Sequence, residues 1–137
     1  MHQRIFNTQA VCLVDVNGDG MLDMVFNNEG QESAVLLGNP AFASKKTPVI
    51  LRVAGNGGVT GSKVRVRDQT GQLLGAQEIS TSSGRGGQGP GHARFALAPG
   101  SYRIEVRFSS GVVRAKEIKV ATAPIREQID EQTPKIE

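Results

Sequence analysis

Oxygen-bearing side chains alternate along residues 15–23, which read Asp-Val-Asn-Gly-Asp-Gly-Met-Leu-Asp. Calcium prefers about six to eight oxygen ligands, drawn from carboxylates, amides and main-chain carbonyls. Gly18 and Gly20 allow the backbone to curl so that such groups converge. We therefore predict a calcium site whose ligands are the side chains of Asp15, Asn17, Asp19 and Asp23 and the carbonyl of Met21.

Two other interpretations of this segment compete with a calcium loop between strands. An EF-hand needs an acid at its twelfth position, where this chain has Phe26, and the flanking apolar runs are too short and β-branched for helices. A metal-free Asp/Asn/Gly turn is the simpler alternative, because these residues favour turns by themselves. Three carboxylates within such a short segment repel one another without a cation, which favours calcium.

The elements that would position this loop are short strands. The pattern predicts strands over residues 10–14, 23–26 and 33–37, with the acidic loop joining the first two. Ala34-Val35-Leu36-Leu37 is apolar without alternation, which is typical of a strand covered on both faces. Three such strands cannot bury themselves, so we expect residues 1–40 to be one unit of a larger assembly.

From residue 47 the pattern changes to alternation of apolar and polar residues, which predicts six strands between residues 47 and 120. Tyr102, Ile104, Val106 and Phe108 would face a core, and the intervening charged residues would face solvent. Such strands form a small β-sandwich or an open barrel. Residues 41–46 would be a linker, and residues 121–137 a polar tail, with a short helix at 125–132 as an alternative.

Composition narrows the function classes. Sixteen basic and 13 acidic residues give a net charge of +3, a mild excess that does not indicate nucleic-acid binding. Cys12 is the single cysteine and is expected to be a small buried apolar residue. The chain has no apolar run long enough to span a membrane and no signal peptide at its start, so we expect either an intracellular protein or part of a longer one.

Residues 10–38, with Asp15-x-Asn17-x-Asp19-Gly20-x-x-Asp23 and then Met24-Val25-Phe26-Asn27-Asn28, resemble an FG-GAP/VCBS repeat. Residues 47–120 resemble an ASPIC/UnbV domain through residues 58–66, 94–97 and 106–111, although Phe108-Ser109 stands where that family has a Trp-Pro pair. The first resemblance implies one blade of a β-propeller with structural calcium at the ligands named above. Together they imply a protein related to cartilage acidic protein that is extracellular, periplasmic or at the cell surface.

We therefore expect an all-β protein with a partial propeller blade followed by a sandwich or open barrel. Its function would be a non-catalytic, calcium-stabilised interaction or adhesion module. Its partner would be missing upstream blades, another protein chain or a second copy joined through exposed strand edges.

Alternative functions would depend on residues outside the acidic loop. The glycine-rich loop 80–92 with His92 would serve an enzyme or an accessory subunit of one, although no partner for His92 stands at readable spacing. Residues 55–63 resemble a phosphate loop only superficially, because Gly61-Ser62-Lys63 has the wrong order and leads into a strand. A carbohydrate- or polyanion-binding role would use exposed arginines such as Arg103 and Arg107.

Overall fold

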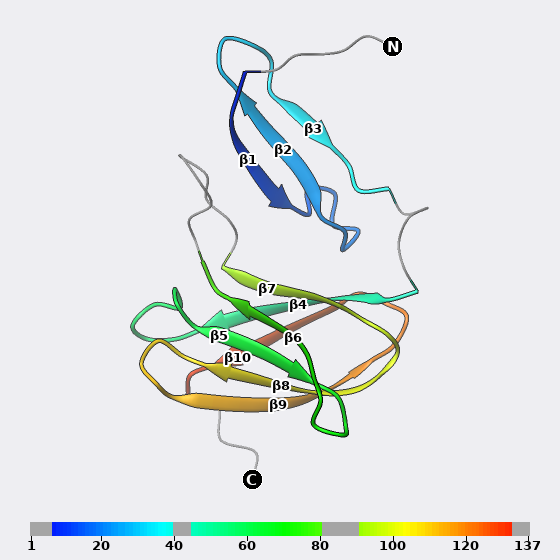
Figure 1. The fold of residues 1–137 in the computed structure, drawn as a ribbon, viewed down its shortest axis with the longest axis vertical. Helices are drawn as coiled ribbons and strands as arrows, with labels where there is room; N and C mark the ends of the chain where they lie inside the picture. The colour runs from blue at the N-terminus through cyan, green and yellow to red at the C-terminus, as the bar shows by residue number, and fades with distance from the viewer. Residues whose placement is uncertain (1–6, 40–44, 81–90, 133–137) are drawn as a thin grey trace. The chain divides into compact units, whose positions relative to one another are not determined.

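The computed structural model describes residues 7–39, 45–80 and 91–132, and every regular element in these ranges is a β-strand. The chain divides into two compact units (Figure 1). Unit 1 is described for residues 7–39, and unit 2 for residues 45–80 and 91–132. The all-β prediction is therefore confirmed. None of the described sheets closes into a barrel, so the strands form separate sheets and not the open barrel that was the alternative.

Unit 1 contains a meander of three antiparallel strands, β1 (Thr8–Val14), β2 (Asp23–Asn28) and β3 (Ala34–Leu36). These strands confirm the predicted ones to within two residues at each end. Asn28 fixes the turn between β2 and β3, because its side-chain amide donates to the carbonyl of Glu32 at a distance of 2.8 Å. Its side-chain oxygen accepts from the hydroxyl of Thr8 in β1, also at 2.8 Å.

Unit 2 consists of two sheets. One has the order β10-β4-β7, from β4 (Thr47–Ala54), β7 (His92–Leu97) and β10 (Ile125–Asp130). The other has the order β6-β5-β8-β9, from β5 (Lys63–Arg67), β6 (Leu73–Glu78), β8 (Gly100–Arg107) and β9 (Val113–Val120). All neighbours are antiparallel except β10 and β4, which run parallel.

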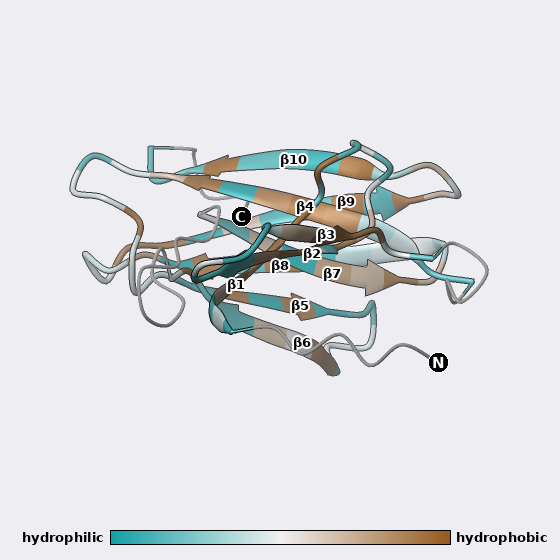
Figure 2. Cartoon of the chain, turned by 90° about the horizontal axis from the view of Figure 1, so that it is seen from above, coloured by the Kyte–Doolittle hydropathy of each residue, from teal (hydrophilic) through white to brown (hydrophobic). Residues whose placement is uncertain are grey.

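A single apolar core joins the two sheets of unit 2, as in a sandwich. Val49 and Leu51 from one sheet and Val64, Ile104 and Val106 from the other are all fully buried. Apolar and charged residues alternate along β5, as its brown and teal segments illustrate (Figure 2). The inward positions predicted along β8 are confirmed, since Tyr102, Ile104, Val106 and Phe108 are all buried.

The prediction for the segment after residue 120 was wrong for residues 125–130. They form neither a polar tail nor a helix but strand β10, parallel to β4. Ile129 is 1% exposed in the core, and the Lys116 ammonium of β9 forms an ion pair with Glu127 of β10, between the two sheets. Two isoleucines separated by polar residues gave little local signal, and the parallel partner of each residue lies 76 positions earlier in the chain, as in Ile125 opposite Val49.

Candidate functional site

The acidic loop joins β1 to β2, and its two glycines adopt the conformation that the sequence predicted. Gly18 and Gly20 have φ angles of 80° and 89°, in the left-handed region that favours glycine. The register of the hairpin places Val14 opposite Asp23, so the loop begins and ends at one rung of the ladder. The flanking strands therefore bring the first and last predicted ligands to the same end of the sheet.

Asp15 and Asp23 gather main-chain N–H groups from different parts of unit 1. The Asp15 carboxylate accepts hydrogen bonds from the N–H groups of Gly18 and Gly20, at distances of 2.7 and 3.0 Å. The fully buried Asp23 carboxylate accepts from Val16 within the loop and from Gly38 beyond β3, each over 2.8 Å. Asp23 thus ties the loop to the segment that leaves the third strand.

Asn17 and Asp19 form the exposed half of the loop. The Asn17 amide donates to Asp19 Oδ2 over 2.9 Å, and Asn17 Oδ1 accepts from the N–H of Asp19 over 3.1 Å. Asp19 Oδ1 accepts from the N–H of Met21 over 2.8 Å. The four predicted side-chain ligands therefore all act as acceptors inside one short loop, which fits both a calcium loop and a metal-free turn.

The side chains of the loop are of the types that bind calcium, but in this structure they lie too far apart to share one ion. A carboxylate offers about four lone-pair positions, so one that accepts N–H groups keeps further capacity for a hard cation. Over the part of the chain that the structure describes, however, no three His, Cys, Asp or Glu side chains are grouped closely enough to hold a metal. Calcium binding would therefore have to draw these carboxylates closer together than they lie here.

Gly38 is the residue of this site that the sequence did not indicate. Its N–H donates to Asp23, and a Cβ atom on it would lie 3.0 Å from the carbonyl oxygen of Leu22 and 3.1 Å from Cβ of Met21. A side chain at this position would meet backbone at a distance tighter than ordinary contact. Only the Asn-Pro pair that follows it hints at a turn.

The other predicted site residues lie in unit 2. Residues 81–90 of the glycine-rich loop lie outside the described residues. His92 is at the start of β7, opposite Arg52 of β4. Partial burial lowers the pKa of His92, and the positive charges of Arg94, Arg52 and Arg126 lower the pKa further. This surrounding favours the neutral imidazole.

The predicted outward face of β5 and β8 is confirmed. Arg65 lies opposite Glu105 and Arg67 opposite Arg103, while the residues between them point into the core. Arg65 and Glu105 form an ion pair of 3.7 Å, and Arg103 and Glu117 one of 3.9 Å. Exposed pairs of this kind contribute roughly 0–1 kcal/mol each.

Comparison with known proteins returns little that is close to this chain. No protein-family profile and no curated protein sequence matches it. Among solved structures it is similar to BcpA, the major pilin subunit of Bacillus cereus, at 9% identity and a TM-score of 0.44. A variant of the same subunit aligns at 12% identity and a TM-score of 0.39. Each alignment covers 80% of this chain but 36% of the pilin chain, so the chain spans only about a third of that protein.

Proposed function

We propose that the chain is a non-catalytic, calcium-stabilised interaction module that acts outside the cell or at its surface. The observation that carries this proposal is the sheet of unit 1, whose two faces are both apolar and both largely exposed. A sheet of this kind is stable only when another layer covers it. The acidic loop at one end of the same sheet supplies the calcium part of the proposal.

The strand register shows how apolar both faces are. On one face Val11 lies opposite Phe26, and Leu13 lies opposite Met24, which lies opposite Leu36. On the other face Cys12 lies opposite Val25, which lies opposite Val35. Leu13, Met24, Val35 and Leu36 are between 46% and 58% exposed. In Figure 2 the apolar residues of β2 and β3 stand out in brown.

The resemblance to FG-GAP/VCBS repeats suggests what covers these two faces. In a propeller each blade is covered on both faces by its neighbours, which is the environment that unit 1 needs. The partner is therefore further blades of the same protein or another protein chain. The ASPIC/UnbV resemblance of unit 2 supports an extracellular, periplasmic or cell-surface location. Within the described ranges no helix is long and apolar enough to cross a membrane.

Calcium would have a structural role in this module. Asp15, Asn17, Asp19, Asp23 and the Met21 carbonyl would hold the ion, which would neutralise three carboxylates in one loop. Asp15 and Asp23 already order the main chain around them through N–H donors. Part of the free energy of calcium binding would then appear as stability of unit 1.

The enzyme alternative has less support from the described residues. The charged groups that act on His92 are three arginines, which neither accept its proton nor orient it as a carboxylate would. We therefore assign no catalytic residue.

Thermal unfolding with and without calcium tests the metal directly. We expect excess calcium to raise the melting temperature and EDTA to lower it, because a ligand at about 100 times its Kd stabilises the folded state by about 2.7 kcal/mol. Magnesium should have little effect, since it retains its water more strongly. Asp19→Asn should abolish most of the calcium-dependent shift, because it removes an exposed ligand charge without removing a buried acceptor.

Asp68→Asn is the matched control. Asp68 closes the turn between β5 and β6, where its Oδ1 accepts from the main-chain N–H of Thr70 and Gln72. This variant should keep the full calcium response. A melting temperature that does not change between calcium and EDTA would remove calcium from the proposal, and the exposed sheet faces would then be its only support.

A further inference from the structure

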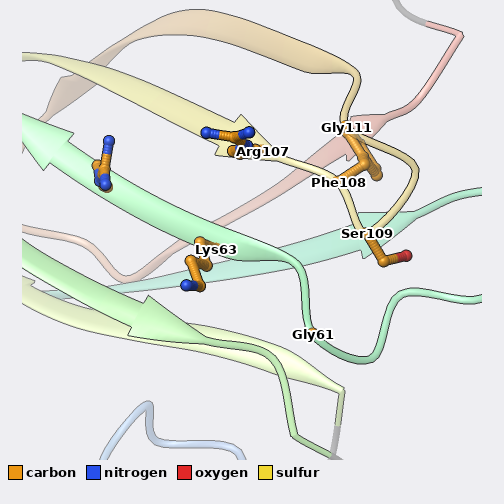
Figure 3. A pocket seen from close by; sticks show the side chains of 7 residues that line it. Gly61, Lys63, Arg107, Phe108, Ser109 and Gly111 are labelled. Carbon is orange, nitrogen blue, oxygen red and sulfur yellow. The ribbon is translucent and has the colours of Figure 1, made fainter.

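A pocket of about 440 Å³ lies where β5 begins and β8 ends, within unit 2. Its lining comes from two adjacent strands and the turns beside them: Gly61, Lys63, Arg65, Arg107, Phe108, Ser109 and Gly111. Figure 3 shows Lys63 and Arg107 on these neighbouring strands, with Gly61, Phe108 and Ser109 beyond the strand ends. Three of the seven lining residues carry a positive charge, and none carries a negative one.

Two of these charges lie directly opposite each other. The register of β5 and β8 pairs Lys63 with Arg107. Like charges at opposed positions of a sheet destabilise it. Throughout the described chain neither side chain forms an ion pair or a side-chain hydrogen bond, although Lys63 has Glu78 of β6 as its other neighbour in the ladder.

The rest of the same ladder is arranged differently. At its far end Arg67 also lies opposite Arg103, but the Arg67 guanidinium donates to the carbonyl of Gly71 over 2.9 Å and Arg103 pairs with Glu117. Between the two ends, Arg65 pairs with Glu105. Lys63 and Arg107, the residues beside the pocket, are therefore the opposed pair of this ladder in which neither side chain has a hydrogen-bond or ion-pair partner among the described residues.

Hydrogen bonds fix the turn that forms the other wall of the pocket. The N–H of Gly111 donates to the carbonyl of Phe108 over 2.9 Å, and Phe108 is 3% exposed in the core. The N–H of Ser109 donates to the hydroxyl of the fully buried Ser62, over 3.3 Å. The Ser109 hydroxyl, in contrast, has no hydrogen-bond partner among the described residues. A turn held by hydrogen bonds thus forms the wall of the pocket, and in Figure 3 the Ser109 hydroxyl points away from the side chains of Lys63 and Arg107.

We propose that this pocket binds a sulfate or phosphate ester carried on a sugar-sized molecule. Such a group accepts several charge-assisted hydrogen bonds, which an ammonium and a guanidinium can supply together. Opposed residues have Cβ atoms about 5 Å apart, so Lys63 and Arg107 can both reach one tetrahedral anion. A pocket of about 440 Å³ is in the usual range for small-molecule sites, which leaves room for the carrier of the anion. The site is independent of calcium and of the acidic loop.

Amide chemical shifts of the full ¹⁵N-labelled chain at low salt test this site with three probes: glucose 6-sulfate, glucose 6-phosphate and glucose. We expect at least one ester to shift the amides of Gly61, Lys63, Ser109 and Gly111, and glucose to shift none of them. Lys63→Gln with Arg107→Gln should weaken ester binding by at least about tenfold, because two charge-assisted contacts are lost. Binding should also weaken as salt is added.

The control is Arg67→Gln with Arg103→Gln, which removes the same charge from the same two strands and should change the affinity by less than about twofold. Binding of only one ester supports the site and identifies its class of ligand. Equal losses in both double variants, shifts with glucose alone, or no ester binding at low salt would each overturn the proposal. The Lys63/Arg107 double variant should melt at the same or a higher temperature, because it relieves a like-charge contact. If the double variant does not fold, the single Arg107→Gln variant takes its place in the binding experiment.

Discussion

At the scale of single residues, Asp23 connects parts of unit 1 that lie far apart in the chain. It is fully buried, and its two oxygens accept from N–H groups that lie on either side of β2 and β3 in the chain. One charged side chain therefore connects the start of the loop to the residue that follows the meander.

Replacing Asp23 with Ala should destabilise unit 1, because the N–H groups of Val16 and Gly38 would both lose their acceptor. Each unsatisfied donor costs about 1–3 kcal/mol, so we expect the loss to be at least about 2 kcal/mol. Hydrogen exchange of these two amides, measured in EDTA, should accelerate by more than tenfold.

Asp19→Ala is the control for this substitution, since Asp19 is exposed and bonds only within the loop. It should leave the exchange of the Gly38 amide nearly unchanged. If both substitutions accelerated that amide equally, the connection through Asp23 would be wrong.

At the scale of elements, β10 completes the smaller sheet of unit 2. It pairs in parallel with β4 from Ile125 opposite Val49 to Asp130 opposite Ala54, and it covers part of the core with Ile129. Parallel pairing requires a connection that leaves one sheet and returns. Here that path runs through β5 to β9.

Ile129→Ala should therefore destabilise unit 2 by about 2–5 kcal/mol, as other truncations of a fully buried isoleucine do. Urea unfolding followed by tyrosine fluorescence measures this loss, because Tyr102 is the only tyrosine of the chain and is buried in the same core. Gln128→Ala, at the exposed neighbouring position, should change the stability by less than about 0.5 kcal/mol. Similar effects of the two substitutions would show that β10 does not stabilise the core.

At the scale of the whole molecule, the two units differ in how much of their apolar surface they bury. Unit 2 encloses a core of residues that are at most 9% exposed. Unit 1 leaves apolar side chains exposed on both faces of one small sheet. Exposed apolar surface of this extent is typical of a protein that associates with another layer.

We expect the chain on its own to self-associate through unit 1 as its concentration rises. Leu13→Ser with Met24→Ser should shift the chain toward monomer in light scattering, because these residues oppose each other on one apolar face and are 49% and 46% exposed. Leu73→Ser with Leu74→Ser is the matched control in unit 2, where both residues are also 46% exposed. A parent chain that stays monomeric over the whole concentration range would contradict this expectation.

Much of the architecture was determined by local pattern. Strict alternation identified the residues of β8 that enter the core, because neighbouring side chains of a strand point to opposite faces. The glycines of the acidic loop were expected to curl for the same kind of local reason, and their positive φ angles agree. The continuous apolar run before Gly38 indicated strand β3, but Val35 and Leu36 are 52% and 58% exposed, so the predicted cover on both faces stays a prediction.

Only the tertiary structure decided which distant residues meet. The strand character of residues 125–130 depends on β4, the acceptor for Gly38 is fifteen residues earlier in the chain, and Lys63 faces Arg107 because of the register between β5 and β8. A sequence pattern indicates which way a side chain points, since that depends on the backbone around it. The partner that it meets depends on strand order and register, which follow from burying all the apolar faces at once.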